Sequence, residues 1–417
     1  MKSTSLAAIG IAFAAAFGPL AVQAQTVKVA FIDPMSGPLA ATTQNQRRNI
    51  DETLAYLRKR DKWPDDFKFE VVPFDNKNEP QTSLIQLNKA VNEGYRFILQ
   101  GLSSSVSHAM IEGVNKYNER NPGKEILLLN PTSTDTELTN EKCSFWHFRF
   151  EPNTDMKAEA TTSQIVQNMP EVKKIYLINA NYAMGQATSK ALKELLKRKK
   201  PSLEIVGDDL VPFNQVKDYS PYVAKIKASG ADLVVTSLFG PDIIGILKAA
   251  RDAGIKTKMF TYYAHNRGVA GSLGDAFVGQ VYNTTLWNPN NPPDFKGSEL
   301  LTAFRKKYPG DDINVPNIPN VFAMVAAAVL KAKSTEPVKV AYAMEGMKMN
   351  GLADEIEMRK SDHQLQQPLY VTTYVKVDGK DKDLKFDTDG SGYGWKTIKR
   401  LDAFVASQPT SCQMKRP

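Results

Sequence analysis

Apolar and polar positions along this chain alternate between two periods. Short, continuously apolar runs such as residues 27–33 (VKVAFID) indicate buried strands. Each is followed by a segment in which apolar residues recur every three or four positions, as in 42–60, where Ile50, Leu54 and Leu57 share one face. Apolar strands separated by helices of this length predict parallel sheets covered on both faces.

The pattern divides the chain into two arrays of similar size. The first has expected strands at 27–33, 67–74, 95–100 and 125–130, and helices at 42–60, 80–92 and 104–117. The second has expected strands at 174–179, 203–211, 233–239 and 258–263, and helices at 184–198, 219–228 and 242–253. Beyond them we expect helices near 297–308 and 318–333, strands near 352–359 and 368–377, and a polar, glycine-rich end from 387.

The first 24 residues have the pattern of a secretory signal peptide. Lys2 precedes an apolar stretch from Leu6 to Phe17, and Ala21 to Ala24 form a small-x-small site that predicts cleavage before Gln25. The alternative is a membrane anchor, but the apolar stretch is short for about 30 Å of hydrocarbon and Pro19 interrupts it. We therefore expect an exported protein, located in the periplasm of a Gram-negative cell.

Charge and motifs exclude several classes of function. The net charge is +8, and basic runs such as 197–200 fall on or at the end of expected helices without interleaved aromatic residues. Nucleic-acid binding is therefore not expected. The common phosphate-loop, zinc-protease and serine-hydrolase motifs are missing, and the four histidines have no metal-ligand spacing. The sequence predicts no enzyme activity, no cofactor and no metal.

Cys143 and Cys412 are the only two cysteines. An isolated pair in an exported protein is expected to form a disulfide. The bond would tie the C-terminal tail to the segment before Phe145.

Two hydroxyl-rich turns follow strands of the first array. Residues 101–105 (GLSSS) open a helix, and residues 130–134 (NPTST) follow the next strand. Ligands of doubly wound sheets bind at the carboxyl ends of the strands, where backbone N–H groups and hydroxyls suit a carboxylate. The alternative is that these Ser and Thr residues only cap helices and turns.

At this level of detail the sequence resembles the branched-chain amino-acid binding proteins of ABC importers, which have the type I solute-binding fold. The resemblance is carried by residues 30–38 (AFIDPMSGP), 100–105 (QGLSSS), 130–139 (NPTSTDTELT), Phe148-Arg149 with Asp155, 182–185 (YAMG) and 362–364 (DHQ). The order and spacing of these motifs are more specific than any one of them.

The resemblance implies two doubly wound α/β lobes joined by a three-strand hinge. Its boundaries would be 25–148 plus 285–370 for lobe 1, 149–284 plus 371–400 for lobe 2, and 401–417 for a C-terminal tail. A ligand carboxylate would be held by Ser104 or Ser105 with Thr132, Ser133 and Thr134. From the second lobe, Tyr182, Phe239 and Tyr263 would face the ligand.

One position departs from the family pattern. Amino-acid binding members carry an acidic partner for the α-ammonium in the turn that here reads 261–266 (TYYAHN), and Tyr263 stands near that position. Asp33 or Asp242 could substitute from nearby turns, and Tyr rings could offer cation–π contacts. Thr42 stands near the position of an aromatic gate in lobe 1. A ligand without an ammonium, stacked on Tyr182, Phe239, Tyr262 and Tyr263, is therefore a serious alternative to a branched-chain amino acid.

The expected function is capture of a small solute between the lobes and its delivery to an inner-membrane permease. The solute would be a branched-chain amino acid, an aromatic or aliphatic acid, or an amide, and the protein would act as a monomer. Two alternatives stay open: a periplasmic sensor that signals to a receptor, and a periplasmic hydrolase.

Overall fold

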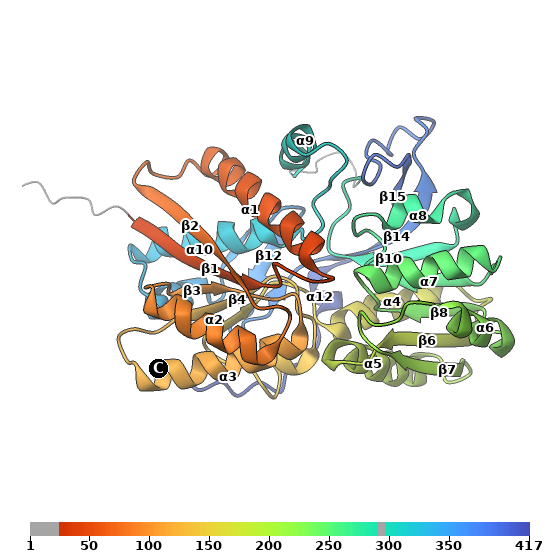
Figure 1. Cartoon of the computed structure of the whole chain (residues 1–417), viewed down its shortest axis with the longest axis horizontal. Helices are drawn as coiled ribbons and strands as arrows, with labels where there is room; N and C mark the ends of the chain where they lie inside the picture. Colours follow the sequence, from red (N-terminus) through yellow and green to blue (C-terminus); the bar gives the residue numbers. More distant parts are fainter. Residues whose placement is uncertain (1–24, 291–296) are drawn as a thin grey trace, which may run out of the picture.

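The computed structural model describes residues 25–290 and 297–417, so the expected signal peptide at 1–24 lies outside the described residues. Two sheets stand side by side, each with helices on both faces (Figure 1). We call the part built on the first sheet lobe 1 and the part built on the second sheet lobe 2. This is the α/β fold with parallel sheets that the sequence predicted.

Lobe 1 contains a five-stranded parallel sheet in the order β2-β1-β3-β4-β5. Alternate residues of β1 face opposite sides: Val29 and Phe31 pack toward α1, α10 and α11, whereas Ala30 and Ile32 pack toward α2 and α3. The elements are β1 (Gln25–Asp33), α1 (Ala40–Arg60), β2 (Phe67–Asp75), α2 (Pro80–Asn92), β3 (Phe97–Leu99), α3 (Ser104–Arg120), β4 (Leu127–Asn130), η1 (Thr136–Thr139), β5 (His147–Arg149), α10 (Ile318–Ala332) and α11 (Pro337–Met344).

Lobe 2 contains a seven-stranded sheet in the order β15-β14-β10-β9-β8-β6-β7. Strands β6 to β10 are parallel, and β14 and β15 add an antiparallel edge. The elements are α4 (Thr154–Asn168), β6 (Lys174–Ala180), α5 (Ala183–Lys199), β7 (Glu204–Val211), α6 (Ser220–Ser229), β8 (Leu233–Thr236), α7 (Pro241–Asp252), β9 (Lys258–Thr261), α8 (Val269–Leu273), η2 (Asp275–Phe277), β10 (Val281–Thr285), β14 (Leu369–Lys376) and β15 (Tyr393–Leu401). Helix α9 (Ser298–Lys307) lies against α1 of lobe 1, and its Leu300, Leu301 and Phe304 join an apolar cluster that continues into lobe 2.

Several elements differ from the sequence-based prediction. Strand β8 ends at Thr236, so Phe239 lies in the turn beyond it and not on the strand. Strand β15 begins inside the segment expected to be polar and irregular, because it completes the antiparallel edge against β14. Strands β5 and β10 and helix α4 were not predicted. A small third sheet was partly missed: it consists of β11 (Lys348–Asn350), β12 (Glu355–Met358) and β13 (Leu365–Gln366).

The segments that cross between the lobes are held together by a buried arginine. The backbone N–H of Arg149 donates to the carbonyl of His363, and its Nε donates to Gln364 Oε1 at 2.6 Å. The other guanidinium nitrogens donate to the Asp135 carbonyl and the Thr139 hydroxyl. Burial lowers the pKa of Arg149 to about 10, which leaves it charged at neutral pH.

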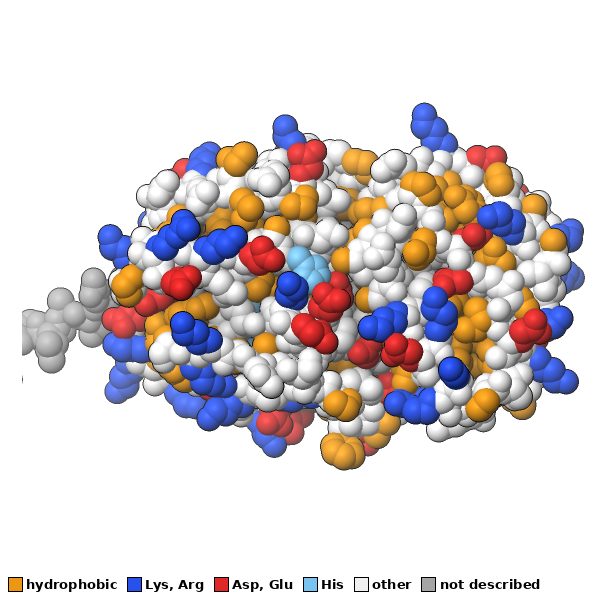
Figure 2. Space-filling model, turned by 90° about the horizontal axis from the view of Figure 1, so that it is seen from below, with side chains coloured by type: hydrophobic (Ala, Val, Ile, Leu, Met, Phe, Trp, Pro, Cys, Tyr) orange, Lys and Arg blue, Asp and Glu red, His pale blue; other side chains and the backbone are white. Residues whose placement is uncertain are grey.

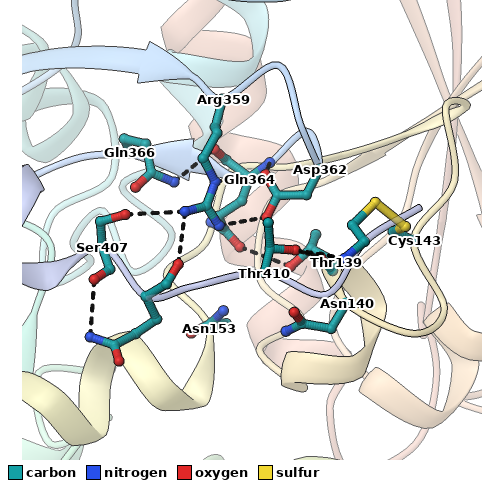
Figure 3. Close-up of polar contacts among 12 residues, drawn as sticks. Thr139, Asn140, Cys143, Asn153, Arg359, Asp362, Gln364, Gln366, Ser407 and Thr410 are labelled. Carbon is teal, nitrogen blue, oxygen red and sulfur yellow. Dashed lines mark hydrogen bonds and ion pairs between the residues drawn. A yellow bond between two sulfur atoms is a disulfide. The ribbon is translucent and has the colours of Figure 1, made fainter. Parts of the chain in front are cut away.

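The C-terminal tail runs from β15 of lobe 2 to the disulfide in lobe 1, and Figure 3 shows contacts that hold it. The tail begins with the short helix α12 (Ala403–Ala406). The two residues that follow this helix accept hydrogen bonds from Arg359, one at the Ser407 hydroxyl and one, at 2.8 Å, at the Gln408 carbonyl. Thr410 Oγ1 donates to the Thr139 carbonyl at 2.9 Å. The disulfide between Cys143 and Cys412 then closes the chain over 269 residues, which confirms the predicted pairing.

Candidate functional site

A small cavity lies between the lobes, lined by residues at the carboxyl ends of the parallel strands of both sheets. Its volume is about 60 Å³. Its walls come from both lobes and consist of Thr42, Leu102, Ser104, Thr132, Ser133, Glu151, Lys157, Tyr182, Met184, Phe239, Tyr262, Tyr263, His265, Asn266, Thr284, Thr285, Leu286, Asn314, Val315 and Pro316.

The lobe 1 wall is formed by the two hydroxyl-rich turns. Ser104, at the start of α3, accepts hydrogen bonds from the N–H groups of Thr134 and Asp135, each at 3.3 Å, so its own proton is free for another acceptor. The Thr132 hydroxyl oxygen is buried and has no partner among the described residues. A Cβ on Gly101 would lie 2.8 Å from this oxygen, so the close approach of the two turns requires glycine.

The other three predicted hydroxyls differ in their surroundings. Ser133 lines the cavity, but its hydroxyl is already bonded to Ser107 Oγ at 2.6 Å and to the Gly101 carbonyl. Ser105 and Thr134 do not belong to the cavity wall, although Thr134 Oγ1 is buried without a partner in the described part of the chain. The sequence could not separate Ser104 from Ser105, because the rotation of α3 decides which one faces the cavity.

Asp33 lies beneath the first turn and holds its shape. Its Oδ1 accepts from the Leu102 N–H at 3.2 Å and from Gln100 Nε2 at 3.4 Å. The side chain is fully buried, and burial raises the pKa of Asp33 to about 7. Neither Asp33 nor Asp242 lines the cavity, so neither provides the substitute acidic group that the sequence suggested.

Aromatic side chains form the lobe 2 wall. Tyr182, Phe239 and Tyr263 pack together with Leu39, Leu102 and Met184, with the Phe239 and Tyr263 rings 5.6 Å apart. Tyr182 also stacks on Phe213 at 4.5 Å. All four aromatic residues expected at this wall, including Tyr262, line the cavity. Their faces suit a flat or apolar part of a solute.

A buried ion pair in the cavity was missed by the sequence analysis. Lys157 Nζ lies 2.6 Å from Glu151 Oε1, and both side chains are less than 10% exposed. Asn317 Nδ2 donates to the other Glu151 oxygen at 2.7 Å. Lys157 Nζ also lies 4.7 Å from the centre of the Tyr263 ring. Burial raises the pKa of Glu151, while Lys157 opposes that shift. The six-residue spacing does not predict this contact, because Glu151 precedes α4 and Lys157 lies within it.

His265, in the turn at 261–266, also lines the cavity, although the sequence analysis did not assign it to the site. Asn283 Oδ1 accepts from the Thr261 hydroxyl and the Ala264 N–H, so Asn283 Nδ2 must be the donor to His265 Nδ1, at 3.1 Å. The proton of His265 is therefore on Nε2. Burial, with the nearby Lys157 charge, lowers the pKa of His265 to about 3, so the ring is neutral.

Two larger hollows lie on the described part of the protein. One, of about 610 Å³, shares Thr42, Asn266 and Asn314 with the cavity wall. The other, of about 710 Å³, includes His108, Asp135, Asp155 and Glu194 and shares no lining residue with the cavity. The view from below shows a histidine with acidic side chains beside it midway along the molecule (Figure 2). Over the described residues, no group of His, Cys, Asp and Glu could hold a metal ion and no helix could cross a membrane.

A family model described as "Periplasmic binding protein" matches residues 26–381. The chain belongs to the periplasmic binding protein family. The curated relatives of this periplasmic binding protein include "Leu/Ile/Val-binding protein homolog 4" of Brucella melitensis, 29% identical over 411 residues, with 96% of this chain and 95% of the relative covered. "Leu/Ile/Val-binding protein" of Escherichia coli is 25% identical over 245 residues, 59% of this chain and 63% of the relative. These relatives are binding proteins and not enzymes.

Solved structures show the same fold as this periplasmic binding protein. The leucine-, isoleucine-, valine-, threonine- and alanine-binding protein of Brucella ovis, in a closed conformation, has a TM-score of 0.80 and 29% identity, with 94% of this chain and 100% of that chain covered. A solute-binding protein of an ABC transporter from R. palustris, in complex with 4-hydroxybenzoate, has a TM-score of 0.74 and 18% identity, with 91% and 97% covered. The type I solute-binding fold is thereby confirmed.

Proposed function

We propose that this protein is the extracytoplasmic solute-binding component of an ABC importer. It captures a small carboxylate-bearing solute between its lobes and delivers it to a permease in the inner membrane. The observation that carries the proposal is the cavity at the facing ends of two parallel sheets, with free hydroxyls on one wall and aromatic rings on the other.

Each wall contributes a different part of the binding. In this proposal, Ser104 and Thr132 donate to the carboxylate, Ser133 shapes their turn, and Tyr182, Phe239 and Tyr263 contact the rest of the solute. A solute that touches both walls stabilises the arrangement in which the lobes are close, and so shifts the population toward it. The lobe boundaries stated above (25–148 plus 285–370, and 149–284 plus 371–400), a monomeric state and cleavage before Gln25 are part of the same proposal.

The ligand class follows from the cavity and from relatives. The names of the Brucella relatives support a branched-chain amino acid. The R. palustris complex and the aromatic wall support an aromatic acid. An aliphatic acid or an amide would use the same hydroxyls.

Calorimetry on matched variants tests the site. In Ser104→Ala/Thr132→Val, we expect at least a tenfold loss of affinity for the acid that the wild type binds best among leucine, benzoate and 4-hydroxybenzoate, because two donors to a carboxylate are lost. Ser105→Ala is the control, since this serine is the next residue of α3 but lies outside the cavity wall. Equal affinities in all three proteins would contradict the assignment.

Delivery needs a separate experiment. We expect a strain that lacks this chain to lose uptake of the radiolabelled ligand and to recover it with the wild type but not with the double variant. Undiminished uptake in the deletion strain would contradict the importer role.

A further inference from the structure

The charges in and around the cavity select one ligand class among those of the proposed function, on which this inference rests. Glu151 is the only carboxylate among the described residues that line the cavity. Both of its oxygens are already engaged, one by Lys157 and the other by Asn317. The turn that carries Tyr263 supplies no acidic side chain.

An ammonium group would therefore enter this cavity at a disadvantage. To reach Glu151 it would have to displace the Lys157 ammonium or lie beside it, and like charges repel strongly where water is excluded. A carboxylate has the opposite interaction, because the Lys157 charge lies in the same cavity as the Ser104 and Thr132 hydroxyls. The Nε2–H of His265, which has no partner within the described chain, adds a neutral donor.

The hollow that adjoins the cavity is positively charged. Lys217, Lys248 and Arg267 line it, and no Asp or Glu does so among the described residues. Lys217 and Lys248 form no ion pair with the described part of the chain, whereas Arg267 lies 3.7 Å from Asp311. Two carboxylates lie close to it in the chain: Asp218 follows Lys217, and the buried Asp242, in the first turn of α7, accepts from the Asn214 N–H. The second hollow, which contains Asp135, Asp155 and Glu194, shares no residue with the cavity. It therefore does not set the charge where the basic hollow meets the cavity.

We propose that the ligand is a small organic acid that carries net negative charge and no ammonium group, and that Lys157 is the residue that selects it. The Glu151 carboxylate acts through Lys157: it accepts from the ammonium and holds it in place. The basic hollow raises the rate at which such an acid reaches the cavity.

Titration calorimetry with pairs of compounds that differ only in the ammonium tests this inference. The pairs are 4-methylpentanoate with leucine, and 3-phenylpropionate with phenylalanine. In at least one pair, we expect the affinity for the acid to be at least ten times the affinity for the corresponding amino acid. Tighter binding of leucine or phenylalanine would overturn the inference and leave the proposed function intact. If neither these compounds nor benzoate and 4-hydroxybenzoate bind, both fail.

Substitutions in the ion pair separate the two roles. Lys157→Met should lower the affinity for the preferred acid at least tenfold. Glu151→Gln should change it less than threefold, because the amide oxygen can still accept from Lys157 Nζ and hold the ammonium in place. Recognition of an ammonium by Glu151 would give the reverse order. Since Lys157→Met leaves a buried carboxylate unpaired, Glu151→Gln/Lys157→Gln provides a second variant without net charge, for which we also expect a tenfold loss. Thermal denaturation checks that each variant is folded.

Stopped-flow kinetics measure how much the basic hollow contributes to the association rate. Lys217→Gln/Lys248→Gln should lower the association rate of the acid three- to tenfold at low salt, with no change in dissociation and a weaker salt dependence. Lys227→Gln, an exposed lysine of α6 outside this hollow, is the control. An association rate unchanged by the double substitution would contradict the role of the hollow.

Discussion

Removal of the bond between Cys143 and Cys412 perturbs a link that runs from lobe 2 back to lobe 1. The variant is Cys143→Ser/Cys412→Ser, which keeps side chains of similar size. In the folded protein the tail would still have its hydrogen bonds, including those from Thr410 to Thr139 and from Ser411 to the Asn140 side chain. The main effect is therefore expected in the unfolded chain, which gains conformational freedom.

The sequence separation sets the magnitude. For a loop of 269 residues, the chain-entropy relation gives an upper value of about 5.6 kcal/mol at 25 °C. Residual structure in the unfolded chain reduces this value, so we expect a loss of about 3–5 kcal/mol. With an unfolding entropy of roughly 0.9 kcal/mol/K for a chain of 417 residues, the melting temperature should fall by about 3–6 °C.

Urea denaturation and scanning calorimetry measure the effect. The urea m-value should rise, because the unfolded chain without the crosslink exposes more surface. Thr410→Val is the control: it keeps the disulfide but removes the two hydrogen bonds of the Thr410 hydroxyl, to the Thr139 carbonyl and from the Cys412 N–H. It should lower the free energy of unfolding by about 1–2 kcal/mol. If the double serine variant were no less stable than Thr410→Val, the entropic account of this disulfide would be wrong.

Three further substitutions test other parts of the fold. Gly185→Ala should destabilise the protein by about 3 kcal/mol or more and weaken ligand binding, because the added Cβ would lie 1.9 Å from the Ala180 carbonyl oxygen. Gly271→Ala is the control. Its Cβ would lie 3.5 Å from its nearest neighbour, so urea denaturation should show almost no change in stability. Asp33 binds a proton in the folded protein up to pH about 7 but in the unfolded chain only up to about 3.8, so its contribution to stability falls as pH rises between these values. Asp33→Asn should remove up to about 4 kcal/mol of this pH dependence of the free energy of unfolding. If the free energies of unfolding of variant and wild type changed equally between pH 4 and 8, the raised pKa of Asp33 would be wrong. Arg149→Lys should lower the free energy of unfolding by about 2–4 kcal/mol, because an ammonium cannot reach Gln364, Asp135 and Thr139 together. Arg60→Lys, in the partly exposed ion pair with Asp61, is the control and should lower it by about 0.5 kcal/mol or less.

Local patterns were sufficient for much of the fold and part of the site. Helix α2 has the bounds that its apolar period predicted, because its buried face repeats every three to four residues. The placement of the hydroxyl-rich turns on the cavity wall follows from a rule about strand ends that needs only the order of elements. The disulfide could be predicted because there are only two cysteines to pair.

Contacts between distant segments depended on packing that no local pattern encodes. Strand β15 was missed because its polar residues alternate on an edge that exists only once β14 lies beside it. The contact of Arg149 with Gln364 joins residues 215 positions apart. The pairing of Glu151 with Lys157 depends on how the chain turns from the crossing segment into α4, and the choice between Ser104 and Ser105 depends on the rotation of α3. The sequence alone therefore determined most of the elements and the edge at which the site lies, since these follow from local periodicity. Only the tertiary structure decided which side chains meet there, because burial and charge arise when both lobes are assembled.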